Sequence, residues 1–455
     1  MNPQYLLRGS ITKALITLAL PIMGTAFLQM ANQIVDMIWI GRLGSDAVAA
    51  IGTAGFFVWF GLSIITMVQV GTEVKIAQSL GAENESYAKQ IAGMALYLAV
   101  AFGLAYGLFL TLAKGPLIGF FDLNNFEVEK NARSYLGIMA SGMLFSFLNL
   151  VIASMFNGAG QSRLPFKVNS IGILTNIVLD PIFIFVLGLG VGGAALATVL
   201  SQMLVTVILL YMLLHGRLFK VFSLRQPFSL DTVKSMLALG LPVSFQRCLF
   251  NTFSILIAKV IASFGADAIA AQKIGVQIES ITYMTAQGFA AALSAFVGQN
   301  FGAGQFERVR KGTVEAGQIM IAFGIGTSAL LYFFSEPLMR IFVSEVTTVE
   351  IGVRYLKILS ISQVFMCIEM TFSGCFNALN KPLYPAVLGI VFTGLRVPFA
   401  YLLSAPAFLG LDGIWWSISG SSVIKGILML GMVAVLFKYG IPKEDSVLGT
   451  DTELN

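Results

Sequence analysis

Residues 18–50, LALPIMGTAFLQMANQIVDMIWIGRLGSDAVAA, decide how this chain folds. They begin with an apolar run that can cross a bilayer, since a membrane-spanning helix needs roughly 20 mostly apolar residues. A Gly-containing turn then leads into another apolar run. Two blocks of the stretch recur later in the chain at one shared offset, LALPI (18–22) as LGLPV (239–243) and LGSDAVAA (43–50) as FGADAIAA (264–271). The stretch therefore predicts a helical membrane protein with an internal repeat.

The repeat extends over most of the chain. A third block, LGA (80–82) with FGA (301–303), keeps the offset of the first two. Three more matches follow at an offset shorter by one: Asn157 with Asn377, Pro165 with Pro385, and LGVGG (189–193) with LGLDG (409–413). An apolar composition could produce one such match by chance, but not a series that stays in register. We therefore predict two similar halves.

The composition excludes an ordinary soluble protein. Of 455 residues, 57% are hydrophobic and 11% are charged, and the mean hydropathy is +0.84, whereas soluble domains carry about a quarter charged residues. The apolar runs are continuous and about twice as long as the alternating strands of a membrane β-barrel, which disfavours that alternative. They predict twelve membrane helices, at 12–40, 47–78, 88–112, 131–157, 165–188, 192–214, 233–262, 268–299, 308–334, 351–377, 384–405 and 412–437.

Each half holds six predicted helices, so each half returns the chain to its starting side of the membrane. Two parallel copies are expected, and transporters of this kind hold substrate between their lobes and open alternately to each side. The predicted fold class is all-α integral membrane, with twelve transmembrane helices in two parallel-repeat lobes. The expected boundaries are an N-terminal lobe at 1–214, a basic linker at 215–232, a C-terminal lobe at 233–440 and a polar tail at 441–455.

Lysine and arginine are distributed unequally between the two predicted sides of the membrane. The side that holds both termini carries 16 of these residues, and the opposite side carries seven. Because Lys and Arg concentrate in cytoplasmic loops, both termini are predicted to be cytoplasmic.

Two carboxylates are predicted to lie deep in the membrane, Asp36 on the first helix and Asp180 on the fifth. A charged side chain at the bilayer centre costs about 2.5–3.5 kcal/mol on insertion scales and marks a functional site by default. Neither acid has a Lys or Arg at helical spacing. Asp36 and Asp180 are therefore the leading candidates for ion coupling.

Several uncharged polar side chains lie near these acids in the sequence or on the sixth helix. They are Gln29, Asn32 and Gln33 on the first helix, Asn176 on the fifth, and Thr198 and Gln202 on the sixth. Gln29 and Gln33 share a helix face with Asp36, because residues three, four or seven apart lie on one side of a helix. These groups either hold helices together by hydrogen bonds or line a binding site.

If these faces meet inside the N-terminal lobe, oxygen atoms surround two carboxyl groups. Burial and the neighbouring negative charge would then let one carboxyl hold a proton near neutral pH. The same oxygens, from Asp36, Asn176, Asp180 and Thr198, could instead bind Na⁺. The spacing of the residues does not distinguish these two ions.

The second half lacks this pair of acids. The repeat places Ile257 opposite Asp36 and Ala400 opposite Asp180, so ion coupling is expected mainly in the first half. Other charges fall at predicted bilayer depth, and interhelical pairing or a water-lined cavity is expected for each: Arg247, Lys259, Lys273, Glu279, Glu369, Arg396 and Lys425.

Proline occupies equivalent positions, Pro21 and Pro242, in the first helix of each half, and proline bends helices. A hinge at Pro21 is a hypothesis, which undiminished transport by Pro21→Ala would remove.

Flexible methionine surfaces suit varied ligands, so some apolar side chains on these helices are candidates for an adaptable substrate wall. The candidate substrate-binding residues, with the polar groups beside them, are Gln29, Met30, Gln33, Met37, Phe60 and Gln202.

Signatures of enzymes are absent from the sequence. A single histidine, His215, excludes a His-rich metal site and disfavours a catalytic triad, and no P-loop pattern is present. We therefore expect no enzyme activity and no cofactor, with energy supplied by an ion gradient or by a partner.

These residues resemble the multidrug and toxic compound extrusion (MATE) family, most closely its bacterial DinF-like branch. The resemblance is carried by the opening stretch 18–52, by NGAGQSRLPF at 157–166, by NIVLDPIFIF at 176–185 and by FGADAIAA at 264–271. It covers nearly the whole chain up to about residue 440. The combination is specific, although each short motif alone is not.

The resemblance implies a V-shaped twelve-helix fold and cation-coupled efflux of amphipathic, often cationic organic compounds. It assigns coupling to Asp36 and a polar cluster to Asn176, Asp180 and Thr198. Another branch uses carboxylates in the second lobe, and the seventh helix here has none at depth, which favours H⁺ over Na⁺. It further implies a monomer in the bacterial inner membrane, with small organic substrates and no nucleic acid.

Two other interpretations remain open at this point. A lipid-linked oligosaccharide flippase of the same superfamily would be expected to have extra helices and a more cationic cavity, whereas the candidate residues here are acidic. A channel or sensor would not need two alternating lobes. An antiporter is therefore the leading prediction.

Overall fold

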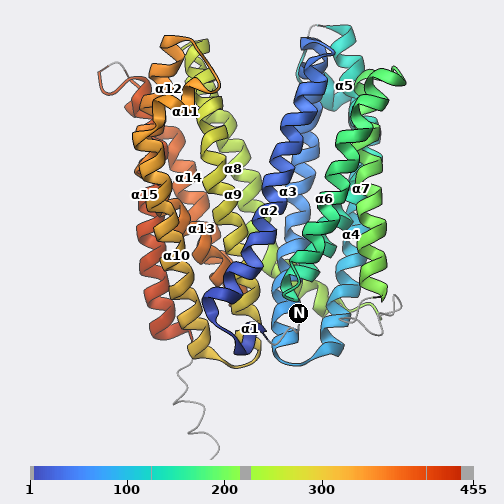
Figure 1. Cartoon of the computed structure of the whole chain (residues 1–455), viewed down its shortest axis with the longest axis vertical. Helices are drawn as coiled ribbons and strands as arrows, with labels where there is room; N and C mark the ends of the chain where they lie inside the picture. The colour runs from blue at the N-terminus through green and yellow to red at the C-terminus, as the bar shows by residue number, and fades with distance from the viewer. Residues whose placement is uncertain (1–4, 124, 216–226, 406, 442–455) are drawn as a thin grey trace, which may run out of the picture. The chain divides into compact units, whose positions relative to one another are not determined.

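The computed structural model describes residues 5–123, 125–215, 227–405 and 407–441, which form helices and contain no strand (Figure 1). The first part of the chain comprises α1 (Tyr5–Arg8), α2 (Ile11–Gly41), α3 (Ser45–Gly81), α4 (Glu85–Gly119), α5 (Phe126–Gly158), α6 (Arg163–Pro181), the π-helix η1 (Ile182–Val186) and α7 (Gly190–His215). The second part comprises α8 (Leu230–Ala262), α9 (Ala266–Gly302), α10 (Phe306–Phe333), α11 (Ser335–Arg340), α12 (Val346–Ser360), α13 (Gln363–Ala378), α14 (Leu383–Leu403), α15 (Leu411–Val435) and the π-helix η3 (Leu436–Gly440).

Most of these helices can span a bilayer. Within the described ranges, ten are long and apolar enough to do so, and the bent pair α12 and α13 makes an eleventh. Helix α9 is 37 residues long but more polar, because Lys273, Gln277 and Glu279 interrupt its apolar sequence. The predicted all-helical membrane fold is confirmed.

The chain divides into two compact units. Unit 1 contains Leu20–Ser244, and unit 2 contains Asn2–Ala19 together with Phe245–Asn455. The divisions therefore fall inside α2 and α8, beside Pro21 and Pro242, and not in a loop. Most of the predicted linker and tail, at 216–226 and 442–455, lies outside the described residues, so the predicted domain boundaries stay predictions.

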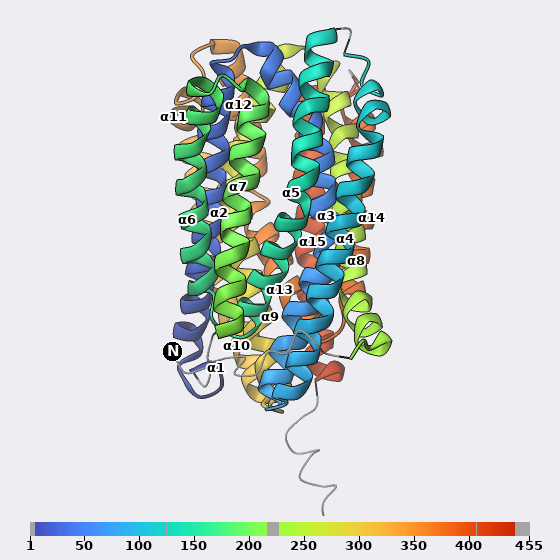
Figure 2. The same cartoon turned by 90° about the vertical axis from the view of Figure 1, so that its right-hand side faces the viewer.

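Unit 1 is organised around α5, which packs against α3, α4 and α7, while α6 packs against α7. Figure 2 shows α6 and α7 side by side. In unit 2, α13 takes the corresponding place and packs against α9, α10 and α15.

One predicted helix, 351–377, is broken in the structure. Helices α12 and α13 meet at a bend of 53°, although the equivalent α5 is continuous. The bend frees backbone carbonyls, and hydroxyl groups satisfy them: Ser419 donates to the Ile358 carbonyl (3.0 Å) and Ser328 to the Ser360 carbonyl (2.6 Å). A break inside a membrane span is tolerated when neighbouring side chains satisfy its backbone in this way.

The duplication is visible in the backbone as well as in the sequence. Non-helical residues with positive φ recur at the repeat offsets: Gly44 (109°) with Gly265 (102°), Glu83 (57°) with Gly304 (70°), Gly160 (78°) with Asn380 (59°), and Gly190 (54°) with Gly410 (57°). Left-handed backbone is costly for most residues, so its recurrence at four paired turns shows that both halves turn in the same way.

The first and last described segments of the chain meet at one end of unit 2. Arg308, in the first turn of α10, donates to the carbonyls of Leu6 (3.0 Å) and Gly9 (2.7 Å), and Arg310 donates to the carbonyl of Ile441 (2.8 Å). Both ends therefore lie on the same side of this unit.

Candidate functional site

The predicted acids lie on α2 and α6, two helices of unit 1 whose side chains meet at several points. A Cβ on Gly24 of α2 would lie 2.7 Å from the ring of Phe166 of α6, and further along Trp39 meets Phe185 edge-on with ring centroids 6.1 Å apart. The contacts run in the same chain direction on both helices. Parallel packing therefore brings the middle of α2 beside the middle of α6.

Two matching Asn-x-x-x-Asp pairs meet at this midpoint. Asn32 Nδ2 donates to Asp36 Oδ2 (3.1 Å) on its own helix and to Asn176 Oδ1 (2.8 Å) across the interface. Asn176 Nδ2 in turn donates to Asp180 Oδ1 (3.2 Å). The two amides thus form a chain of hydrogen bonds between the two carboxyl groups.

The carboxyl groups of Asp36 and Asp180 also lie close enough for their charges to act on each other. A hydrogen bond between two carboxyls requires a proton on one of them. Asp180 is only 1% exposed, and Asp36 Oδ1 is buried without a donor among the described residues. None of the ion pairs in the described ranges includes either acid. Neither acid of the pair therefore has a basic partner among the described residues.

Tyr135 of α5 completes this cluster, and sequence reasoning missed it. Both carboxyl groups lie close enough for their charges to act on its hydroxyl. Its ring packs against the apolar cluster that contains Ile40 and Ile184. The only available signal was its partner in the repeat, Tyr355.

Helix α6 changes its winding directly after the acid. Pro181 follows Asp180, and the next turn is the π-helix η1, in which the Leu187 N–H donates to the Ile182 carbonyl (2.9 Å). Proline has no N–H to donate to the preceding turn, and π-turns are frequent at functional sites. The helix is thus locally widened directly after Asp180.

Two predicted polar residues on α7 make their hydrogen bonds elsewhere. The Thr198 hydroxyl donates to the Ala194 carbonyl of its own helix (3.0 Å). Gln202 accepts from Ser146 of α5 (2.5 Å), and its carbonyl accepts from Asn149 (3.0 Å). The contacts of Gln202 therefore join α5 to α7, and its role in substrate binding stays a prediction.

The remaining substrate candidates lie at the surface of unit 1. Gln29, Gln33, Met37 and Phe60 are exposed, and Met30 is partly buried. Although Gln29 and Gln33 share a helix face with Asp36, Asn32 makes the contact with α6. Their assignment to a substrate wall stays a prediction, as does the hinge at Pro21, where α2 continues as a helix.

Asn32 gives a direct test of the amide chain. Asn32→Ala removes the donor to Asp36, and because that bond favours the ionised carboxylate, transport should require less acidity and reach half-saturation at a higher pH. A hydrogen bond to a charged group contributes roughly 1.5–3 kcal/mol, so the pH of half-saturation should rise by about one to two units. The matched control is Asn169→Ala, whose amide donates only to the Pro165 carbonyl on its own helix (2.8 Å). Equal pH profiles for the two variants would contradict a role for Asn32.

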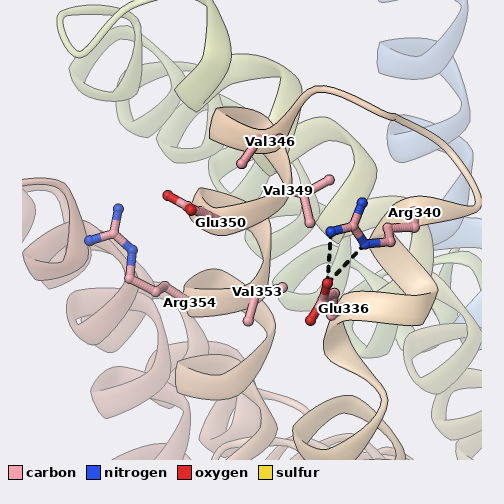
Figure 3. A pocket seen from close by; sticks show the side chains of 7 residues that line it. All are labelled: Glu336, Arg340, Val346, Val349, Glu350, Val353 and Arg354. Atoms are coloured by element: carbon pink, nitrogen blue, oxygen red, sulfur yellow. Dashed lines mark hydrogen bonds and ion pairs between the residues drawn. The ribbon is translucent and has the colours of Figure 1, made fainter.

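A separate groove of about 530 Å³ lies in unit 2 between α11 and α12. Figure 3 shows the paired side chains of Glu336 and Arg340 on one side of a strip of valines, with Glu350 and Arg354 on the other. None of the predicted site residues lines it, and its acids and bases balance one another. The groove has no excess charge with which to select an ion.

Two similar bundles of long helices, with a buried acid pair in one of them, define a duplicated helical membrane protein of the transporter class. A model of the MatE family matches this chain twice, over residues 21–182 and 242–402. The starts of the two matches, and likewise their ends, are separated by the offsets of the repeat. The chain belongs to the MatE family, a family of transporters and not of enzymes.

Relatives of known name agree with this assignment. The chain is 30% identical over 426 residues to the "Probable multidrug resistance protein NorM" of Thermotoga maritima, covering 92% of this chain and 91% of that protein. It is 28% identical to the "Probable multidrug resistance protein YpnP" of Bacillus subtilis, covering 95% and 96%. A crystal structure of "MATE in complex with MaL6" superposes with a TM-score of 0.90 at 26% identity, over 96% of this chain and 99% of that one.

Proposed function

We propose that this protein is a cation-coupled antiporter, driven by H⁺, that exports amphipathic and often cationic organic compounds by alternating access. Its membership of the MatE family and the multidrug resistance names of its relatives support the export of small molecules. The observation that carries the coupling is the Asp36–Asp180 pair, in which Asp180 and the Oδ1 atom of Asp36 are buried and which has no basic partner in the described residues. One bound proton supplies both the missing positive charge and the missing hydrogen bond.

The amide chain explains how such a site responds to one proton. With both acids ionised, like charges repel inside unit 1, and Asp36 Oδ1 has no donor. With one acid protonated, the two carboxyl groups can bond to each other and hold α2 against α6. A proton that binds one arrangement of these helices better than another shifts the population toward it. Movement of α2 at Pro21 is part of this proposal.

Na⁺ is the second candidate for the coupling ion, with Asp36, Asn176, Asp180 and Thr198 as ligands. The Thr198 hydroxyl donates within its own helix, which leaves its oxygen lone pairs available, so this bond does not distinguish the two ions. A shared proton would both relieve the repulsion between the two carboxyl groups and give Asp36 Oδ1 the hydrogen bond that it lacks. The geometry therefore favours H⁺.

The membrane and orientation follow from the same proposal. The contacts of Arg308 and Arg310 gather basic side chains at the end of unit 2 where the first and last described segments meet. By the preference of Lys and Arg for the cytoplasm, this end faces the cytoplasm of a bacterial inner membrane. We expect the protein to act as a monomer.

Transport in proteoliposomes tests the proposal. An imposed pH gradient, with the compartment that receives the cargo more acidic, should drive an amphipathic organic cation such as ethidium uphill, with equal rates in NaCl and in N-methyl-D-glucamine chloride. Cargo movement only in NaCl would replace H⁺ by Na⁺. Movement only down its own gradient would indicate a channel, and transport of a lipid-linked oligosaccharide in its place would indicate a flippase.

A further inference from the structure

Unit 2 contains a buried ion pair. Lys425 Nζ of α15 lies 3.0 and 2.8 Å from the two carboxylate oxygens of Glu369 of α13. The side chains of Lys425 and Glu369 are 7% and 10% exposed. Burying two charges costs several kcal/mol per ion before their attraction is counted, so a pair at this depth is more than a surface contact.

Two further charged side chains extend this pair into a network. Arg396 of α14 donates to the hydroxyls of Ser421 (2.5 Å) and Ser422 (2.8 Å), and its charge acts on both Glu369 and Glu279. The network thus holds two acids and two bases.

Glu279 of α9 is fixed by the broken helix α12–α13. It accepts hydrogen bonds from the hydroxyl of Tyr355 (3.1 Å) and from Gln363 Nε2 (2.9 Å). Gln363 is the first residue of α13, so the 53° bend places this amide where it reaches α9. The break therefore serves the polar network of unit 2.

The repeat relates this network to the acid pair of unit 1. In the register of the repeat, Tyr355 corresponds to Tyr135 and Arg396 to Asn176. The positions of the acids themselves are apolar in unit 2, because Ile257 and Ala400 lie with Tyr355 in one buried hydrophobic cluster. Unit 2 therefore keeps the tyrosine, as Tyr355. Its acids, Glu279 and Glu369, lie at other positions of the repeat and have basic side chains beside them.

The two networks differ in charge. In unit 1, two acids lie together with no basic partner among the described residues, so a cation must enter for the site to approach neutrality. In unit 2, Arg396 and Lys425 already balance Glu279 and Glu369. The ammonium group of Lys425 occupies the position on Glu369 that a free monovalent cation would take.

We propose that Lys425 is a tethered cation at Glu369, which keeps unit 2 from exchanging cations and so sets the number of cations moved in each transport cycle. The inference deepens the proposed function and rests on it. While Lys425 is present, the Glu369 carboxylate should not bind a free cation. Without Lys425 the same carboxylate should recruit Na⁺ or H⁺, because a buried charge does not remain unpaired.

The test uses the full chain, purified in detergent, with Asp36→Asn in every sample so that unit 1 does not contribute. Thermal unfolding is measured in NaCl and in N-methyl-D-glucamine chloride at equal ionic strength. For Lys425→Met, the midpoint should rise with the logarithm of Na⁺ concentration, since a ligand of the folded state stabilises it by mass action. The parent and the charge-neutral double variant Glu369→Gln/Lys425→Met should not respond to Na⁺.

A proton could fill the vacated place in preference to Na⁺, so proton binding is measured in the same variants without Na⁺. Lys425 and Arg396 act on Glu369 directly, Arg396 also acts on Glu279 and Tyr355, and only Lys425 is changed. Lys425→Met should then bind one more proton than the double variant across neutral pH. If Lys425→Met does not yield folded protein, Lys425→Gln keeps a donor for Glu369 without the charge and should behave alike.

Failure of the inference is distinct from failure of the proposed function. Lys425→Met without gained Na⁺ or proton binding would overturn the role of Lys425, whatever Asp36 does. A Na⁺ response that the parent already shows and that Glu369→Gln abolishes would also overturn it, because unit 2 would then exchange a cation in its natural form.

Discussion

Asp36→Asn should reduce proton-driven export to the level of vesicles without protein, while the amount of protein inserted in the membrane stays unchanged. Asparagine preserves the size of the side chain but cannot take up and release a proton. Its amide would also donate permanently to Asp180, so the site would remain in the arrangement that protonation normally creates. Ethidium uptake into proteoliposomes, driven by an imposed pH gradient, measures this loss of export directly.

The control for this variant is Asp46→Asn. Asp46 lies in the first turn of α3, where it is exposed and accepts a long hydrogen bond from Asn125 (3.4 Å). Its substitution changes the charge of the chain equally but leaves the buried pair intact, so transport should persist. Export by Asp36→Asn at the rate of Asp46→Asn would show that coupling resides elsewhere.

Gly240→Ala should have the largest effect on stability. A Cβ at Gly240 of α8 would lie 1.8 Å from the carbonyl oxygen of Met67 on α3, and one at Gly71 would lie 2.2 Å from the carbonyl oxygen of Met236. The obstructing atoms belong to the backbone and cannot rotate away, so the helices must separate. Forcing additional groups into a packed interface costs about 1–3 kcal/mol or more, which should appear as a lower unfolding midpoint and a smaller monodisperse fraction.

The same interface suggests why Gly240 should be sensitive. Ser244, one turn further along α8, donates to the Ser63 carbonyl (2.8 Å), so small residues allow close contact on both sides of the glycine. Close approach through small residues stabilises helix pairs in membranes by packing and hydrogen bonds. The control is Gly55→Ala on α3, where a Cβ meets nothing within 4 Å. The unfolding midpoint of Gly55→Ala should stay unchanged or rise slightly. An equal fall of the midpoint in both variants would show that the close helix contact at Gly240 does not cause the destabilisation.

Much of the fold could be predicted because it depends on local composition. Every predicted helix has a counterpart in the structure, since a segment of about 20 apolar residues buries its backbone hydrogen bonds within itself. The break between α12 and α13 was not predictable in this way. It depends on Ser328 and Ser419, whose hydroxyls come from other helices and satisfy the freed carbonyls.

The candidate site could be predicted only in part. The sequence identified Asp36, Asp180 and Asn176 because carboxylates and amides are costly in lipid, and the structure brings these three together. It favoured Gln29 and Gln33 on the face of Asp36, whereas the contact across the interface is made by Asn32. Helical spacing tells which residues share a face, but not which part of that face meets another helix.

By itself the sequence determined a duplicated, all-helical membrane transporter with two unpaired acids in its first half, because length, apolarity and repeat offset are properties of the chain. Only the tertiary structure decided that Asn32 joins the acids across α2 and α6 and that Tyr135 stands beside them. Tertiary structure also showed that Lys425 neutralises Glu369 in the second half. Each of these contacts joins residues on different helices, far apart in the sequence, and electrostatic balance at such sites depends on distances in space.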